Sequence, residues 1–357
     1  MNNEDCKTVV AAIEDPNTGR PLGDAVRAVA LDKRRAAVDI RLAYPAAGWR
    51  NTLSEIVTER LRASGEVEEV TVDIDWQIPQ HAVQGGLDPI EGVRNVIAVA
   101  SGKGGVGKST VSANLALALL AEGARVGILD ADIYGPSQPR MLGLQGKPQT
   151  TPDKRIVPMS AHGLQCMSIG VLVGTDQAMI WRGPMATQAL QQMVSETRWD
   201  GLDYLIVDLP PGTGDIQLTL AQRIPVSAAV TVTTPQQVAV DDVRRAVAMF
   251  AKVKVPVLGV IENMSTHVCS NCGHEDAIFG TGGGEFIARE AGLPLLGQLP
   301  LDAPIGRSTD EGAPIVVADP EHPSARRFRE IGRRVAGRLS TQSREAKIRM
   351  PKIKITD

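Results

Sequence analysis

Aromatic residues are scarce in this chain, since phenylalanine, tryptophan and tyrosine together make up only 3% of its 357 residues. The core must therefore be built from valine, leucine, isoleucine and alanine, which suits a parallel sheet covered by helices on both faces. A strong charge of either sign is also lacking, because 38 basic side chains nearly balance 41 acidic ones. The composition therefore gives no reason to expect binding to nucleic acid.

Long apolar runs and numerous cysteines are lacking as well. The longest apolar run, around residues 115–121, is far shorter than the roughly 20 residues that a membrane helix needs. The N-terminal segment MNNEDCKTVV is polar and acidic, which is not typical of a signal peptide. Four cysteines are too few for a disulfide framework in so long a chain. We therefore expect a cytoplasmic protein without stable membrane insertion.

The first part of the chain predicts a small α/β domain over residues 1–78. Its expected elements are a helix over 8–13, strands over 26–31 and 36–42, a helix over 52–63 and a strand over 67–74. Residues 79–92 are rich in glycine, proline and glutamine and have no apolar period. This composition predicts an interdomain linker.

Strands alternate with helices in the predicted second domain, over residues 93–340. The expected strands are 93–100, 126–130, 164–169, 204–208, 227–233, 255–261 and 295–297. This alternation predicts a doubly wound, mainly parallel α/β sheet with ligand sites at the carboxyl ends of its strands. A basic, flexible tail is expected over 341–357.

A phosphate-binding loop is indicated by residues 101–110, SGKGGVGKST, which lie between an apolar strand and an apolar helix. Its glycines let backbone N–H groups turn toward phosphate oxygens, and the N-terminus of the following helix favours an anion. We expect Lys108 to neutralise the β- and γ-phosphates and Ser109 to bind Mg²⁺. The predicted nucleotide-binding residues of the loop are Gly102, Lys103, Gly104, Gly105, Val106, Gly107, Lys108, Ser109 and Thr110.

The loop contains a second lysine, Lys103. The pattern Lys-Gly-Gly-x-Gly-Lys-Ser resembles the deviant Walker A sequence of a family that includes MinD, ParA, the nitrogenase iron protein and the arsenite-pump ATPase. The resemblance implies a homodimer in which Lys103 reaches the partner's nucleotide. A cation there would disperse charge on the transferred phosphate, as an arginine finger does. A solvent-exposed loop lysine is the alternative.

Acidic residues end two of the predicted strands. Asp130 and Asp132 follow residues 126–129, and by resemblance to the same family Asp132 is the candidate for positioning the attacking water. Asp208 ends a buried strand in the manner of a Walker B sequence and is expected to reach Mg²⁺ through water. The segment PPGTGD that follows is suited to sensing the γ-phosphate. It ends at Asp215, for which an N-cap role is the alternative.

The strand predicted over 255–261 leads into Glu262-Asn263-Met264. In related ATPases an asparagine at this place binds the edge of adenine, so Asn263 is the candidate for recognising the base. The Asn-Lys-x-Asp signature of many GTPases is missing from the sequence, which favours ATP over GTP. A plain turn asparagine is the alternative.

Cys269 and Cys272 form a Cys-x-x-Cys pair, whose spacing lets one turn present both thiolates to a metal centre. In a homodimer, two such pairs would supply the four sulfurs that a [4Fe–4S] cluster takes. A zinc site is the main alternative, either with four cysteines or with His267 or His274 beside the pair. A redox disulfide is a further one. The pair follows Asn263 closely, which indicates that nucleotide and metal sites communicate.

Several motifs in order resemble the Mrp family of ApbC-like iron–sulfur cluster carrier ATPases over about residues 90–335. They are KGGVGKST, DADIYGPSQPRMLG, DLPPGTGD and ENMS-x3-C-x2-CG-x4-IFG. The resemblance implies a P-loop NTPase of the SIMIBI class that forms a homodimer and hydrolyses ATP slowly. It also implies a labile [4Fe–4S] cluster on Cys269 and Cys272, with cluster scaffold proteins and apo iron–sulfur proteins as partners.

The first 78 residues resemble the small domain that is fused to many bacterial members of this family and also occurs in iron–sulfur targeting factors. Asp15-Pro16 and the strand that ends at Trp76 carry the resemblance. Members often have a cysteine before a proline in the loop after the second strand, whereas residues 44–49 here read YPAAGW. We therefore expect a docking module and no metal site in this domain.

Two other functions fit parts of the sequence. A positioning ATPase like MinD or ParA would need an amphipathic membrane helix or a DNA-binding surface, for which the basic segment 326–339 is the candidate. A regulatory module with a zinc clip and a vestigial ATPase would use the same cysteine pair.

Overall fold

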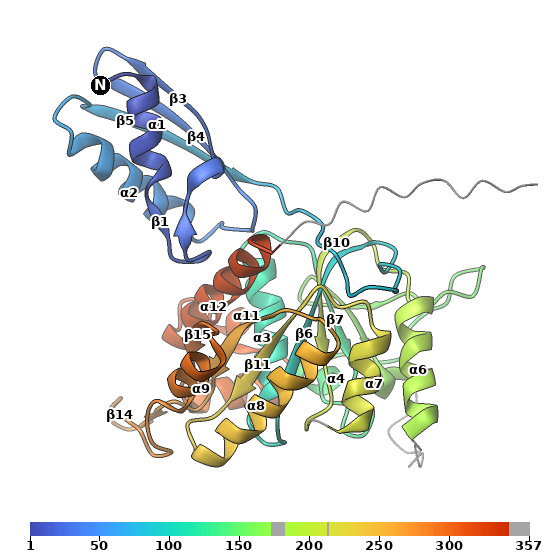
Figure 1. Ribbon diagram of the computed structural model, residues 1–357. Helices are drawn as coiled ribbons and strands as arrows, with labels where there is room; N and C mark the ends of the chain where they lie inside the picture. The colour runs from blue at the N-terminus through green and yellow to red at the C-terminus, as the bar shows by residue number, and fades with distance from the viewer. Residues whose placement is uncertain (173–182, 213, 343–357) are drawn as a thin grey trace, which may run out of the picture.

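A small and a large domain are joined by the segment between Trp76 and Val93 (Figure 1). The computed structural model describes residues 1–172, 183–212 and 214–342 of the chain. The tail predicted over 341–357 therefore lies outside the described residues from position 343 onward. The segment between the domains runs along the surface of the large domain. There the side-chain amide of Gln84 forms hydrogen bonds at 2.6–2.7 Å with three backbone groups of that domain.

In the small domain, two helices cover one face of a three-stranded sheet in which β4 pairs antiparallel with β3 and parallel with β5. Every second residue of β4 is buried, as expected for a strand with one covered face. The first helix begins earlier than the predicted residue 8, because Asn2 and Asp5 form a capping box. The elements are α1 (Asn3–Ala11), β1 (Glu14–Asp15), β2 (Arg20–Pro21), η1 (Gly23–Ala25), β3 (Val26–Asp32), β4 (Arg35–Leu42), α2 (Arg50–Arg62) and β5 (Glu69–Trp76).

An eight-stranded sheet forms the centre of the large domain, in the order β15-β12-β11-β6-β10-β7-β9-β8. All neighbours are parallel except β8 and β9. Two apolar clusters cover the two faces, and the central strand β10 is buried along its whole length. The predicted doubly wound, mainly parallel sheet is confirmed. The strands are β6 (Val93–Ser101), β7 (Val126–Asp130), β8 (Met159–Ala161), β9 (Leu164–Ser168), β10 (Leu202–Asp208), β11 (Ala228–Thr233), β12 (Val257–Glu262) and β15 (Leu295–Gln298).

The helices of the large domain lie on both sides of this sheet, and a short hairpin of β13 (His267–Val268) and β14 (Glu275–Asp276) projects from one end (Figure 1). The helices are α3 (Lys108–Ala121), α4 (Gln138–Met141), α5 (Ile169–Leu172), α6 (Gly183–Glu196), α7 (Asp215–Arg223), α8 (Gln237–Lys252), α9 (Gly283–Ala291), α10 (Ala303–Asp310), α11 (Ile315–Ala318) and α12 (Pro323–Ser340).

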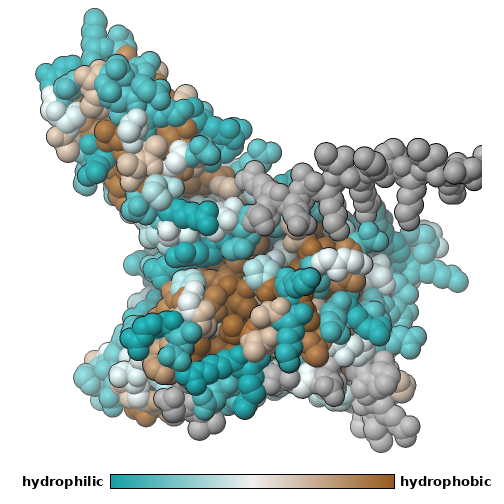
Figure 2. Space-filling view, viewed as in Figure 1, coloured by the Kyte–Doolittle hydropathy of each residue, from teal (hydrophilic) through white to brown (hydrophobic). Residues whose placement is uncertain are grey.

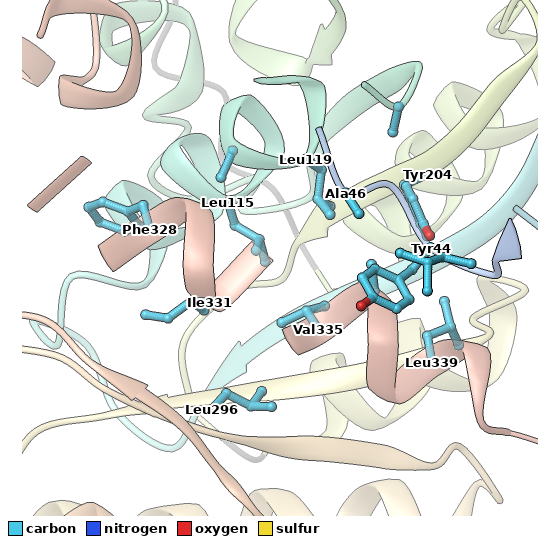
Figure 3. Close-up of a cluster of buried hydrophobic side chains, with 14 of the residues drawn as sticks. Tyr44, Ala46, Leu115, Leu119, Tyr204, Leu296, Phe328, Ile331, Val335 and Leu339 are labelled. Atoms are coloured by element: carbon cyan, nitrogen blue, oxygen red, sulfur yellow. The ribbon is translucent and has the colours of Figure 1, made fainter. Parts of the chain in front are cut away.

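The basic segment predicted as a candidate membrane helix is part of α12, which packs against α3. Its apolar side chains Phe328, Ile331, Val335 and Leu339 are buried in the core (Figure 3). This helix therefore does not present the apolar face that a membrane-binding role would need. Across the described part of the chain, no helix combines the length and the apolar character that crossing a bilayer requires.

The small domain docks on the ends of α3 and α12. Tyr44 and Ala46, from the loop after β4, are buried beside Leu119 of α3 and Val335 of α12 (Figure 3). Figure 2 shows this domain as a separate lobe, and the widest apolar area on the same face lies over the middle of the large domain. Because α3 starts at the phosphate loop, the docked domain and that loop lie at opposite ends of the helix.

Candidate nucleotide site and cysteine hairpin

The phosphate loop connects β6 to α3 through glycines that cannot be replaced without strain. Gly105 and Gly107 have φ angles of +81° and +79°, which other residues rarely adopt. A Cβ on Gly107 would lie 2.3 Å from Nδ2 of Asn263, and a Cβ on Gly102 would lie 2.3 Å from the carbonyl carbon of Asp242. The loop therefore has the backbone form and the close approaches of a phosphate cradle.

Lys108 is buried in this loop and points toward the end of β10. Its Nζ lies 2.5 Å from Oδ1 of Asp208, whose side chain is 0% exposed. The same Nζ lies 3.3 Å from the hydroxyl of Ser109. Two further groups hold the carboxylate, since Ser112 Oγ donates to Oδ1 at 2.8 Å and Gln138 Nε2 donates to Oδ2 at 2.9 Å. The structure thus brings both predicted magnesium residues to one lysine.

A second buried carboxylate, Asp130, is the register neighbour of Asp208 on the parallel strands β7 and β10. Burial, and then the negative charge of Asp208, raise the pKa of Asp130 to about 7. Its oxygens accept hydrogen bonds from the backbone N–H groups of Asp132, Ser137 and Gln138 and from the hydroxyl of Ser168. The oxygens beside Lys108 Nζ are the Ser109 hydroxyl and the Asp208 carboxylate, which are the kinds of ligand that Mg²⁺ takes, so this donor set fits that cation.

Asp132 and Lys103 lie nearer the surface, and both are half-buried. Burial raises the pKa of Asp132 above its ordinary value. Asp132 lines a pocket of about 670 Å³ together with Tyr134 and Pro211. Of the remaining predicted loop residues, Val106 is buried, Thr110 is half-buried, and Gly104 and Gly105 are exposed. In the predicted switch PPGTGD, Thr213 and the side chain of Asp215 lie outside the described residues.

Asn263 follows β12 and contacts the phosphate loop. Its Nδ2 donates to the backbone carbonyl of Val106 at 2.9 Å. The next residue, Met264, has a φ of +57°, an uncommon conformation for a residue other than glycine. The amide predicted to recognise adenine is therefore held against the loop that would bind the phosphates, and the chain continues from it toward the cysteine pair.

The cysteine pair lies in the turn of the β13–β14 hairpin. Cys269 is half-buried and Cys272 is exposed, whereas the other two cysteines, Cys6 and Cys166, are buried. The turn is closed by two backbone bonds, from Cys269 N to His274 O at 2.9 Å and from Gly273 N to Cys269 O at 2.8 Å. The hairpin thus presents its two sulfurs at the surface, as a metal-binding turn requires.

Hydrogen bonding already favours the thiolate form of Cys269. The backbone N–H groups of Asn271 and then Cys272, followed by the Cys272 thiol, lower the pKa of Cys269. Across residues 1–172, 183–212 and 214–342, no three His, Cys, Asp or Glu side chains are grouped closely enough to hold a metal ion. His267 and His274, predicted as ligands in the zinc alternative, therefore do not complete a site with the pair within one described chain.

Three polar residues that hold the site were not predicted from the sequence: Ser112, Gln138 and Ser168. Ser112 is one helical turn after Lys108, and a polar residue on that face of an apolar helix was the available signal. Gln138 bridges the Ser109 carbonyl at 3.0 Å and the Asp208 carboxylate. It follows the Asp-x-Asp segment by a few residues and opens a short helix, which was a weaker signal.

Comparison with known proteins also finds a P-loop NTPase domain in this chain. A family model described as ParA, the NUBPL iron-transfer P-loop NTPases, matches residues 92–336. The iron–sulfur cluster carrier protein of Escherichia coli (strain K12) is 51% identical over 301 residues, covering 82% of this chain and 81% of the relative. A nucleotide-binding protein from Archaeoglobus fulgidus, solved with ADP and containing cobalt, is 36% identical with a TM-score of 0.58, covering 67% of this chain and 93% of its own.

A more distant structure shares the fold alone. The septum site-determining protein MinD from Pyrococcus horikoshii, solved with Mg-ADP, has a TM-score of 0.50 at 23% identity, covering 67% of this chain and 94% of its own. The P-loop fold, the motif order and the family match agree with the resemblance noted in the sequence. The chain therefore belongs to the NUBPL iron-transfer family of P-loop NTPases, to which the motifs had pointed.

Proposed function

We propose that this protein binds and hydrolyses ATP with Mg²⁺, carries a [4Fe–4S] cluster between two copies of the chain, and transfers it to apo-proteins. The single observation that carries the proposal is the short path between the phosphate loop and the cysteine hairpin. Asn263 bonds to the loop carbonyl of Val106, and β13 begins at His267. A change of the loop on nucleotide binding would therefore reach Cys269 within a few residues.

The nucleotide half of the proposal rests on the buried charges. Ser109 and Asp208 would hold Mg²⁺, which supplies charge neutralisation for the phosphates when bound. Lys108 would exchange its contact with Asp208 for the β- and γ-phosphates. Lys103 would contact the partner's nucleotide, and Asp132 would orient the attacking water.

The cluster half rests on the number of thiolates. One hairpin offers two, and a [4Fe–4S] cluster takes four, so two copies complete the ligand set. Exposed apolar side chains beside the nucleotide site support a second copy, because Tyr134 is 55% exposed and lines the same pocket as the exposed Pro211. The carrier name of the Escherichia coli relative supports delivery to apo iron–sulfur proteins.

The proposal is tested by anaerobic reconstitution with iron and sulfide. The parent protein should become brown, contain about four irons and four sulfides per dimer, and sediment as a dimer. The variant Cys269→Ala/Cys272→Ala should lose the visible absorption, while the matched control Cys6→Ala/Cys166→Ala, which changes the two buried thiols, should keep it. Zinc without iron in anaerobically purified protein, or an unchanged spectrum in the first variant, would exclude the carrier function.

Transfer is a separate measurement. The loaded protein is mixed with a cluster-free acceptor enzyme, and acceptor activity is followed with and without Mg-ATP. A transfer rate that depends on the nucleotide supports the coupling, and equal rates under both conditions contradict it.

A further inference from the structure

The cysteine hairpin is attached to the large domain by few contacts. Its strands are only two residues each, too short to be stable alone. Backbone bonds from Val268 N to Leu301 O at 3.1 Å and from Leu301 N to Thr266 O at 2.6 Å hold its first strand. Behind it lies an open cavity of about 420 Å³ with a largely polar lining that includes Glu262, Thr266, Glu275, Gln298, Arg327 and Arg334. Apolar packing therefore does not fix the orientation of the turn.

The second strand of the hairpin is held by one carboxylate. Glu275, three residues after Cys272, accepts a hydrogen bond from Thr266 Oγ1 at 2.9 Å on one oxygen and from Arg327 Nη2 at 3.2 Å on the other. Thr266 belongs to the hairpin's own stem. The ion pair with Arg327 thus joins β14 to a different element, α12, across the mouth of the cavity.

Arg327 belongs to a helix, α12, that is packed firmly against the rest of the large domain. Its helix neighbours Phe328 and Ile331 are buried, and two arginines further along α12 bind a buried glutamate at the far end of α3. A displacement of α12 is therefore costly, whereas a displacement of the hairpin over a polar cavity is not. Of the two partners of the ion pair, Arg327 is therefore on the more rigid element.

We propose that the Arg327–Glu275 ion pair is a positioning contact that holds Cys269 and Cys272 in the orientation in which they bind the cluster. This inference rests on the proposed carrier function. It assigns Arg327 a role at a distance from the sulfurs: the guanidinium fixes β14, and β14 fixes the turn. A partly exposed pair of this kind has a modest effect, about two- to fivefold in an equilibrium or rate.

The test is a charge exchange with a matched control on the same helix. Arg327→Glu should accelerate cluster loss to an iron chelator about two- to fivefold, and the double variant Arg327→Glu/Glu275→Arg should restore the parent rate. Arg326→Glu makes the same charge change one residue away, where Arg326 pairs with Glu321 on the surface, and should leave the rate unchanged. ATP hydrolysis and the thermal midpoint should stay at parent values in all three variants.

Two results would overturn the inference. One is a parent-like loss rate in Arg327→Glu, and the other is failure of the double variant to restore it. If the parent takes up no cluster, the carrier function itself fails. The role of the ion pair is then tested by alkylating Cys269 and Cys272 in the cluster-free protein. The ratio of alkylation rates of Cys269 and Cys272 should then differ between parent and Arg327→Glu, and equal ratios would refute the positioning role.

Discussion

The two ends of helix α3 carry buried charges that are arranged in opposite ways. Just after its C-terminus, Glu122 is fully buried, and its Oε1 accepts from Arg329 Nε at 2.9 Å and Arg333 Nη1 at 2.8 Å. Its other oxygen accepts from the Gly48 N–H of the small domain at 2.7 Å. At the N-terminus, the carboxylates of Asp130 and Asp208 face the single ammonium of Lys108.

This contrast teaches that burial of a charge does not by itself indicate a functional site. Each oxygen of Glu122 has a donor, and the two arginines outnumber the one carboxylate, so this cluster needs no further cation. It joins the small domain to the large one through the hydrogen bond from the Gly48 N–H. At the phosphate loop each oxygen of Asp130 and Asp208 also has a donor, but the two carboxyl groups share the one ammonium of Lys108, and the pKa of Asp130 is raised to about 7. An added cation such as Mg²⁺ would compensate the second negative charge there, which is what a magnesium–nucleotide site requires.

The largest effect is expected from substitutions in the phosphate loop, at the N-terminus of α3. Lys108→Ala should weaken Mg-ATP binding about a hundredfold, since one or two charge-assisted hydrogen bonds to phosphate are lost. Lys103→Ala should change affinity less than about threefold but lower the hydrolysis rate about a thousandfold, because a cation from the partner acts mainly in the transition state. Titration with a fluorescent ATP analogue and a phosphate-release assay separate the two lysines. Equal losses of affinity in both variants would contradict their different roles.

The next largest effect is expected at the C-terminus of α3, where the small domain docks. Glu122→Gln should lower the free energy of unfolding by about 3–5 kcal/mol, because Arg329 and Arg333 lose their buried counter-charge. The measurement is urea unfolding, together with limited proteolysis between residues 77 and 92, which should become faster. Mg-ATP affinity should stay within about twofold of the parent value, since the phosphate loop lies at the other end of α3.

The control for Glu122→Gln is Glu290→Gln. Glu290 forms a surface ion pair with Arg244 at 2.9 Å, so its loss should cost at most about 1 kcal/mol. A similar small cost for Glu122→Gln would show that the interface is not held by its buried charges.

The difference between the two ends also separates what the sequence predicts from what it does not. The nucleotide end follows from local patterns: the glycine loop, the strand-terminal aspartates and the Cys-x-x-Cys turn each occupy a few adjacent residues, and strands such as 126–130 were placed correctly. Parallel strands bring their carboxyl ends together, so the proximity of Lys108 to Asp208 was foreseeable from topology.

The docking end could not be predicted in this way. Glu122, Gly48 and Arg333 are far apart in the sequence, and each looks like an ordinary surface residue or a turn residue. From the sequence, the basic segment of α12 is a candidate for a membrane helix or a DNA-binding surface, because periodicity does not reveal which side of a helix another domain will cover. The antiparallel strand β8 was also missed, since three residues of half-buried character give little signal.

A smaller effect sharpens the comparison at the nucleotide end. Gln138→Ala should weaken Mg²⁺ binding in the presence of nucleotide about tenfold, because the side chain that orients the Asp208 carboxylate is removed. Isothermal titration with Mg²⁺ at saturating ATP measures the change. The matched control is Gln192→Ala, whose side chain bonds to Glu196 on the exposed face of α6. Affinity of Gln138→Ala equal to that of the control would mean that the amide only fills space.

The smallest effect concerns a further buried carboxylate, Asp15 of the small domain. It accepts hydrogen bonds from the Tyr44 hydroxyl at 2.9 Å and from Asn17 N at 3.0 Å. Burial raises the pKa of Asp15 above its ordinary value. A carboxylate whose pKa is higher in the folded state binds its proton more tightly there than in the unfolded chain. The stability that this group contributes is therefore fully present below the unfolded pKa of about 3.9 and is lost as the pH rises through the folded value.

Asp15→Asn removes this dependence and keeps the shape of the side chain. The free energy of unfolding of the parent, relative to this variant, should fall as the pH rises from 4.5 to 7.5, and urea unfolding at both pH values measures it. Parallel pH profiles for the two proteins would show that Asp15 has an ordinary pKa. If the free energy of unfolding falls with rising pH in the parent alone, Asp15 differs from both charge clusters at the ends of α3. It is buried like Glu122, but its hydrogen bonds are satisfied with or without its charge, so its ionisation opposes folding.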